Sequence, residues 1–412
     1  MESASRRMSR GVERAKEVPL DRENYTAHVL EEEPSRLTED DFRCLLMSCV
    51  LSGASDVTFQ SDQAPRAEIH GVLYRAMRKP LAPSDVEMIL METYGGANAR
   101  AEINGQNVLD YSYELNLPDG GRQRFRVNAT GIFGQDGQSV EITMRALPSK
   151  TPDLSMVQIA ESEIEALTPK DGIVIIAGAT GSGKSTTMAA ITRYHLESSI
   201  RPVKIVDIQA PIEYTFRDVT SQLKGSPSII GQSEVNRHIR SFADGVHSAL
   251  RRKPNIINVG EARDLETISA SVEASLTGHL VYTTTHAGSV SSSVRRLLAA
   301  FPGAEKEARA YDLISSLRFL MVQHLVPRID RPGRVPVREY LRFTDRVREK
   351  LLTHPISDWS SLIDREVSDG AVDAGEDDLR MCLHDETMRL RRAGVISKED
   401  ALRISRIKEA EE

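Results

Sequence analysis

An α/β fold built on a parallel β-sheet is predicted by two features of this 412-residue sequence. Short β-branched runs alternate with longer helical stretches between residues 149 and 345, which is typical of a sheet with helices on its faces. A glycine-rich segment directly follows the first of these runs. We expect the core strands at residues 172–177, 203–208, 256–259 and 280–285.

A smaller α+β domain is predicted before this core, at residues 36–148. Thr38 to Asp41 forms a capping-box pattern ahead of an apolar helical stretch at 42–51. Further elements are expected as strands at 55–60, 67–73 and 139–146, a helix at 84–94, and a hairpin of 111–117 and 122–129 around the turn 118–121. Residues 1–35 are polar, so we expect a mobile tail there.

The C-terminal region, residues 346–412, is predicted to be mainly helical. Gly394 suits the end of one helix, and Ser397 with Asp400 suits the cap of the next. The acidic stretch 369–378 is expected to be a solvated loop.

Composition narrows the class of protein. Forty per cent hydrophobic and 27% charged residues are ordinary for a soluble globular chain. The formal charge of −7 weighs against broad nucleic-acid binding, which requires basic surface. No stretch is apolar enough to suggest a spanning helix, and the three cysteines form no C-x-x-C pair. We therefore expect a cytoplasmic protein without a membrane segment, one that would reach a membrane only through partners.

Residues 178–186 read Gly-Ala-Thr-Gly-Ser-Gly-Lys-Ser-Thr and satisfy the pattern G-x-x-x-x-G-K-[ST]. An apolar strand precedes this segment and a helical stretch follows it, which argues against a chance glycine-rich turn. Glycines allow backbone N–H groups to converge on phosphate oxygens, and the helix directs its N-terminus at the anion. We expect nucleotide contacts from Gly178, Thr180, Gly181, Ser182, Gly183, Lys184, Ser185 and Thr186, with Ser185 also ligating Mg²⁺.

The other core strands also end in polar residues. Glu213, Glu261 and His286 follow the second, third and fourth strands. Ligands of open parallel sheets bind beyond the carboxyl ends of the strands, so we expect these three side chains near the nucleotide.

Glu261 is our first choice to orient or deprotonate the attacking water. Glu213 would be a second water-positioning group or a metal partner, and His286 would sense the γ-phosphate or cap the helix near Ser289. The alternative for either glutamate is an exposed loop charge. Gly260 stands where a Walker B aspartate is usual, and no convincing guanine signal N-K-x-D occurs, so ATP is favoured over GTP.

Four segments together resemble the Walker A, Asp box, Walker B and His box of the secretion ATPases. They are residues 178–186, Ala-Pro-Ile-Glu-Tyr at 210–214, Val-Gly-Glu-Ala-Arg-Asp-Leu-Glu-Thr at 259–267 and Leu-Thr-Gly-His-Leu-Val-Tyr-Thr-Thr-Thr-His at 276–286. Residues 241–254 most resemble the DotB/TraJ branch of type IVB secretion and conjugation systems, which is related to PilT. The chain departs from the family at Gln209-Ala210, where an acidic pair is common.

The resemblance implies a RecA-like core, a PAS-like N-terminal domain, nucleotide held between the two, and a homo-hexameric ring that serves inner-membrane secretion or conjugation components. It implies Glu261 as catalytic glutamate, Glu213 as Asp-box glutamate and metal partner, and His286 as His-box histidine, with His279 as a second candidate. The arginines Arg240, Arg251, Arg126 and Arg145 are candidates to complete the pocket, or else solvated charges.

A motor is the leading functional hypothesis, in which ATP hydrolysis drives domain motion that powers type IVB secretion or conjugative transfer. The alternatives are a PilT-like pilus retraction motor, a nucleic-acid translocase, and a nucleotide-gated adaptor that scarcely hydrolyses ATP. A translocase would need a basic, aromatic-bearing channel, and only 5% of the residues are aromatic.

Overall fold

The computed structural model describes residues 11–30, 32–96, 98–118, 121–134, 137–198, 201–221, 227–368 and 379–405. The chain divides into two compact units, Met1–Lys150 and Thr151–Glu412. Two features expected from the sequence, the turn residues 119–120 and the acidic stretch 369–378, lie outside the described residues.

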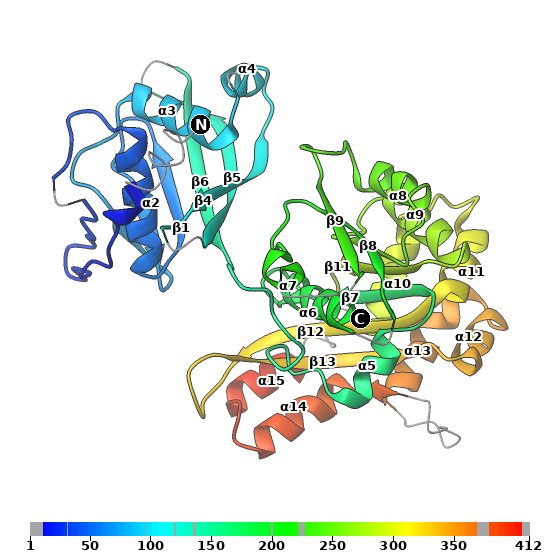
Figure 1. Ribbon diagram of the computed structural model, residues 1–412. Coiled ribbons are helices and arrows are strands. Elements are labelled where there is room, and N and C mark those ends of the chain that lie inside the picture. The colour runs from blue at the N-terminus through cyan, green and yellow to red at the C-terminus, as the bar shows by residue number, and fades with distance from the viewer. Residues whose placement is uncertain are drawn as a thin grey trace. The chain divides into compact units, whose positions relative to one another are not determined.

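The first unit is a six-stranded antiparallel sheet with helices, in the order β3-β2-β1-β6-β5-β4 (Figure 1). Its strands are β1 (Ala54–Gln60), β2 (Arg66–Ile69), β3 (Val72–Arg75), β4 (Leu109–Asn116), β5 (Arg122–Ile132) and β6 (Ser139–Leu147). Its helices are α2 (Glu39–Leu51), α3 (Pro83–Tyr94) and α4 (Ala99–Asn104). The capping box at α2 is confirmed, because Thr38 Oγ1 accepts from the Asp41 amide at 3.2 Å.

Two expectations for this unit differ from the structure. The single strand predicted at 67–73 is a hairpin, because His70 and Gly71 turn the chain with φ values of 52° and 77°. The mobile tail predicted at 1–35 is packed over much of its described part. Ala27 and Val29 donate from their amides to the Arg75 and Ala76 carbonyls, and both side chains are buried. A few apolar residues in a polar segment thus suffice to anchor it.

The second unit is an eight-stranded sheet in the order β14-β13-β12-β7-β11-β10-β8-β9. The four predicted strands are β7 (Gly172–Ala177), β8 (Lys204–Gln209), β10 (Ile256–Val259) and β11 (Leu280–Thr285). The others are β9 (Ile229–Glu234), β12 (Leu317–Pro327), β13 (Arg334–Arg342) and β14 (Arg380–Met381). Six strands are parallel, as the sequence predicts, and β13 and β14 extend the sheet with antiparallel pairing that the sequence analysis did not predict.

Helices cover both faces of this sheet, as the alternation of strand and helix predicts. One core packs Ile173, Ile175 and Ala177 of β7 against one group of helices: α8 (Phe242–Leu250), α9 (Leu265–Leu276), α10 (Val290–Ala299), α11 (Lys306–Ser316), α12 (Asp345–Leu352) and α13 (Trp359–Ser368). The other packs Val174 and Ile176 against α5 (Glu161–Leu167), α6 (Lys184–Glu197) and α7 (Arg217–Thr220). Alternate residues of β7 thus face opposite cores, which fixes its register.

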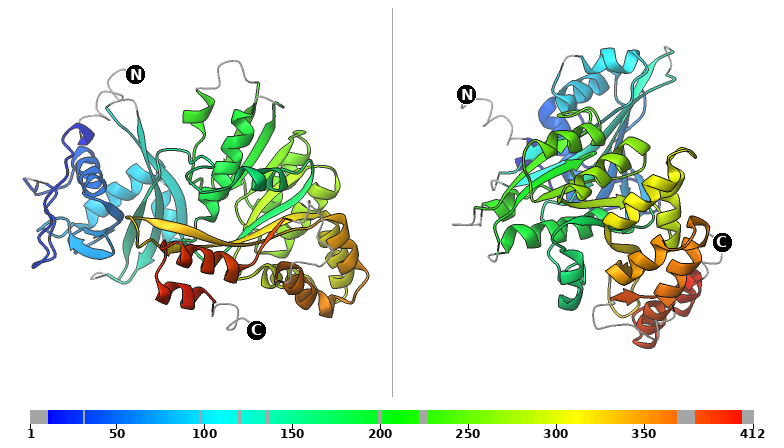
Figure 2. Two further views of the ribbon diagram at one scale, coloured as in Figure 1. Left: turned by 90° about the horizontal axis from the view of Figure 1, so that it is seen from below. Right: turned by 90° about the vertical axis from the view of Figure 1, so that its right-hand side faces the viewer.

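The C-terminal helices α14 (Leu383–Arg392) and α15 (Lys398–Ser405) pack beside the long strands β12 and β13, as the left view of Figure 2 shows in red and yellow. Gly394 has a φ of 70°, and the Asp400 amide donates to Ser397 Oγ at 3.0 Å, so both capping predictions are confirmed. The region also contains β14 and the short 3₁₀ turn Ile356–Asp358, and is therefore not purely helical.

Acidification is expected to destabilise the second unit through His195 of α6. Tyr282 donates its hydroxyl hydrogen to the Leu167 carbonyl at 2.7 Å, so its oxygen accepts from His195 Nε2 at 2.7 Å. Burial lowers the pKa of His195 to about 4. The unfolded chain, with a histidine pKa of about 6.5, therefore takes up a proton first as the pH falls, and stability is lost between pH 6.5 and 4.

At pH 5 this coupling is worth about 2 kcal/mol of unfolding free energy relative to neutral pH. Denaturant unfolding of the wild type and His195→Gln at pH 7.5 and pH 5 measures it. The glutamine keeps a donor for Tyr282 but does not titrate, so the wild type should lose more stability than the variant. Equal losses in the two proteins would show that His195 does not carry the effect.

Candidate functional site

The glycine-rich segment forms a loop between the end of β7 and the start of α6. Gly178, Gly181 and Gly183 have φ values of 145°, 78° and 87°, which residues with a Cβ rarely adopt. A Cβ at Gly178 would lie 2.3 Å from the Gln323 carbonyl oxygen and 2.5 Å from Ser182 Oγ. Both conformation and space therefore require glycine at this position.

Lys184 begins α6 and is only 9% exposed. Its Nζ donates to the carbonyl oxygens of Gly178 at 2.8 Å and Ala179 at 2.9 Å, which holds the ammonium against the loop. Burial lowers the pKa of Lys184, while the charges of Glu261 and Glu213 oppose that shift. The lysine and the two carboxylates therefore share one electrostatic environment at the carboxyl edge of the sheet.

Glu261 follows β10 and contacts His286, which follows β11. His286 Nε2 lies 3.3 Å from Glu261 Oε1, and Arg263 Nη1 lies 4.0 Å from Glu261 Oε2. Burial is the main cause of a lowered pKa of His286, and the Lys184 charge adds to it. The helix α10 has its own cap, since Ser289 Oγ accepts from the Ser292 amide at 3.1 Å. The contact of His286 is thus with the acid rather than with the helix end.

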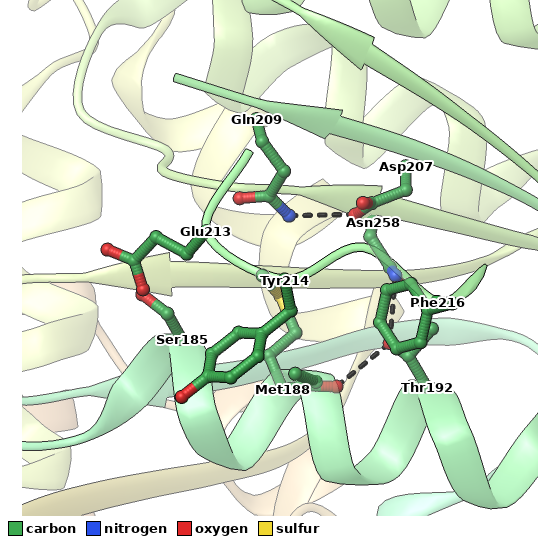
Figure 3. Close-up of a pocket in the computed structure, with 10 residues that line it drawn as sticks. Ser185, Met188, Thr192, Asp207, Gln209, Glu213, Tyr214, Phe216 and Asn258 are labelled. Atoms are coloured by element: carbon green, nitrogen blue, oxygen red, sulfur yellow. Dashed lines mark hydrogen bonds between the residues drawn. The ribbon is translucent and has the colours of Figure 1, made fainter. Parts of the chain in front are cut away.

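Glu213 and Ser185 line one small pocket, and Figure 3 shows their side chains pointing toward one another. The segment that carries Glu213 is anchored on both sides. The Ile212 amide donates to the buried Glu234 carboxylate at 3.2 Å, and Tyr214 Oη lies 3.0 Å from Thr186 Oγ1. Glu213 is therefore held beside the first turn of α6 by the folded chain.

This donor set fits magnesium that shares its coordination with phosphate. One hydroxyl and one carboxylate leave most positions for phosphate oxygens and water, which is how Mg²⁺ is commonly bound in nucleotide sites. In the described parts of the chain, no group of three or more His, Cys, Asp or Glu side chains could hold a metal ion by itself.

Sequence reasoning missed Asp207 and Asn258, which line the same pocket from β8 and β10. Asp207 is 2% exposed and accepts from Gln209 Nε2 at 2.7 Å, as Figure 3 shows. It also accepts from Gln232 Nε2 at 2.7 Å. Burial raises the pKa of Asp207 against these hydrogen bonds. Gln209, which stands where the family commonly has an acid, is thus bonded to an acid two residues earlier. The sequence feature that could have identified Asp207 was a carboxylate in the middle of an otherwise apolar strand.

The four candidate arginines lie in both units, two in each. Arg240 is exposed just before α8. Arg251 caps the other end of α8, and Lys204 Nζ at the start of β8 donates to the adjacent Arg252 carbonyl. Arg251 therefore lies near the amino edge of the sheet, opposite the loop.

Arg126 and Arg145 stand opposite each other on β5 and β6 of the first unit. Arg126 Nη2 lies 2.5 Å from Asp110 Oδ2, and Arg145 Nε lies 2.8 Å from Asp56 Oδ1. Both are ion-paired within their own unit, and their contact with nucleotide stays a prediction.

His279 precedes β11, so it lies at the amino edge, as expected for a residue further from the phosphates. Its Nδ1 is 3.1 Å from the Ala274 carbonyl oxygen. A cavity of about 490 Å³ opens beside it, with Lys170, His195 and Arg201 among its lining residues. This cavity is distinct from the pocket of Ser185 and Glu213.

A buried lysine in a glycine-rich loop, with two carboxylates at the same sheet edge, defines a P-loop ATPase with a RecA-like core. The profile of the family described as "Type II/IV secretion system protein" matches residues 39–361, so the chain belongs to that family and is an ATPase of the DotB/PilT branch. None of the helices in the described ranges has the length and apolar character needed to cross a membrane.

Three relatives illustrate the similarity. The type IV pilus retraction ATPase PilT of Pseudomonas aeruginosa is 31% identical over 375 residues, which cover 90% of this chain and 99% of that protein. The structure of the Legionella pneumophila ATPase DotB is 36% identical with a TM-score of 0.79, covering 90% of this chain and 97% of that one. The pilus retraction motor PilT with bound ADP is 26% identical with a TM-score of 0.71, covering 87% and 95%.

Proposed function

We propose that this chain is a motor that binds ATP and Mg²⁺ at the loop 178–186 and couples hydrolysis to domain motion. The observation that carries the proposal is the contact of Lys184 with the loop carbonyls at the sheet edge where Glu213 and Glu261 follow β8 and β10. Backbone amides of the loop and Lys184 would hold the phosphates, since phosphoryl transfer depends mainly on positioning and charge neutralisation. The solved PilT structure with bound ADP supports a nucleotide as the ligand.

Glu261 is proposed to orient the attacking water and accept its proton, and His286 to hold Glu261 in place through their 3.3 Å contact. Ser185 and Glu213 are proposed to hold Mg²⁺, which would neutralise charge on the phosphates. Burial and the nearby charge of Lys184 lower the pKa of His286, which disfavours a second positive charge beside Lys184.

The proposed working form is a homo-hexameric ring in which arginines from another unit or subunit complete each site. Arg126, Arg145, Arg240 and Arg251 are the candidates, and none of them needs to reach the loop within one core to act in this way. Closure on binding and reopening after hydrolysis would then produce mechanical work.

If each nucleotide site is completed by arginines from another unit or subunit, ATP turnover per chain should depend on assembly of the ring. Turnover is expected to rise several-fold as protein concentration passes through the assembly transition, because diluted chains lack the completing arginines. Light scattering and steady-state ATPase activity, measured on the same dilution series with ATP and Mg²⁺, check this. Turnover that stays flat across the transition would argue against shared sites.

The proposed place of work is a type IVB secretion or conjugation apparatus at the inner membrane, supported by the similarity to DotB. A pilus retraction motor is the second candidate, supported by the similarity to PilT. Expression of the chain in strains that lack either relative separates them. Restored secretion without restored twitching would favour the first, and the reverse result the second.

A further inference from the structure

A buried chain of polar side chains links the phosphate loop to the segment that opens the second unit. Gln323 lies on β12 and is 2% exposed, and Arg338 lies on the neighbouring β13 and is 6% exposed. The two residues belong to strands that the sequence did not predict, and neither is among the proposed catalytic groups.

Each polar atom of the Gln323 side chain has a defined partner. Its Nε2 donates to the Ser182 carbonyl oxygen within the phosphate loop at 2.7 Å. Its Oε1 accepts from Thr187 Oγ1 at 3.0 Å and from Arg338 Nε at 2.9 Å. The main chain of Gln323 is also close, since a Cβ at Gly178 would lie 2.3 Å from its carbonyl oxygen. Gln323 therefore contacts the loop near both of its ends.

Arg338 carries the connection away from the loop. Its Nη1 donates to the Gln158 carbonyl oxygen at 2.8 Å, and its Nη2 donates to the Val157 carbonyl oxygen. These carbonyls lie in the first residues of the second unit, which begins at Thr151. If the buried guanidinium lost one of these acceptors, an unpaired buried donor would remain, which costs free energy. The hydrogen bonds of Arg338 are therefore expected to be kept or lost together.

We propose that Gln323 is a positioning residue of the phosphate loop, and that Arg338 acts through it to couple the loop to residues 157–158. The proposal rests on the proposed nucleotide site at 178–186. When the loop closes on phosphate, Ser182 and Gln323 would keep its backbone in place. A shift of the segment after the unit boundary would reach the loop through two side chains.

The coupling is tested by measuring nucleotide affinity with a fluorescent ADP analogue. The variants are Gln323→Met, Arg338→Met and the double variant. Gln323→Met is expected to raise Kd about tenfold, because it removes the donor to Ser182. Arg338→Met should raise Kd about fivefold, and the double variant no further than Gln323→Met alone. Effects that multiply in the double variant, or an unchanged Kd in Gln323→Met, would overturn the proposal.

Arg318→Met is the matched control, since Arg318 lies on the same strand as Gln323 but pairs with Asp171 at 2.9 Å. It should leave Kd unchanged. If Arg338→Met does not fold, Arg338→Lys replaces it in the cycle. Lys184→Ala, measured in parallel, separates the two hypotheses: unchanged affinity there would refute the nucleotide site itself, whereas loss there with none in Gln323→Met refutes only the coupling.

Hydrogen exchange supplies a readout that a purely structural role would not move. ADP binding should slow amide exchange at residues 154–160 of the wild type, and this effect should shrink in Gln323→Met at saturating ADP. An equal effect in both proteins would contradict transmission through Gln323.

Discussion

Lys184→Ala is expected to abolish most nucleotide binding and to lower ATP turnover by at least about 100-fold. The structure places this lysine on the phosphate loop and within the influence of Glu213 and Glu261. Its ammonium already contacts two loop carbonyls, so its loss removes charge and leaves those carbonyls facing the phosphates. Titration with a fluorescent ADP analogue and a steady-state phosphate-release assay measure the two effects.

Lys170→Ala provides the comparison for this prediction. Lys170 lines the cavity at the opposite edge of the sheet, so its removal should change neither affinity nor turnover. A larger loss in Lys170→Ala than in Lys184→Ala would place the nucleotide in that cavity and contradict the proposed site.

Glu261→Gln should lower kcat by about 10²- to 10⁴-fold while nucleotide affinity changes little. The amide preserves the size of the side chain and can still contact His286, but it cannot accept a proton from water. A motor should lose its cellular activity with this change, whereas a nucleotide-gated adaptor should keep it. Single-turnover hydrolysis and Kd, measured on the same preparation, separate chemistry from binding.

Glu266→Gln is the matched control, because Glu266 is an exposed acid in the first turn of α9, five residues from Glu261. It should hydrolyse ATP at the wild-type rate. Similar losses in both variants would mean that local charge, rather than the position of Glu261, sets the rate.

The phosphate loop and the four strands that position it were predictable because their signals are local. Glycines at 178, 181 and 183, a preceding apolar run and a following helix all lie within one segment, and three strand ends carry polar residues. The contact of His286 with Glu261 follows from neighbouring parallel strands. These parts depend on sequence neighbours and on the general geometry of parallel sheets.

The parts of the fold and site that the sequence analysis missed depend on contacts between residues that are distant in sequence. The apolar run of β12 reads equally well as a buried helix, so neither that strand nor Gln323 could be placed from periodicity. Asp207 accepts a hydrogen bond from Gln232, 25 residues away, and Arg338 donates to carbonyls 180 and 181 residues earlier. The hairpin of β2 and β3 was missed because His70 adopts a positive φ that its residue type only weakly suggests.

An experimental structure of the full chain with Mg²⁺ and a non-hydrolysable ATP analogue tests the central claim most directly. We predict that the triphosphate lies in the loop 178–186, against Lys184, with the metal beside Ser185 and Glu213 and with Glu261 facing the terminal phosphate. Nucleotide bound at the amino edge, near Lys170 and His279, or a terminal phosphate remote from both acids, would contradict it.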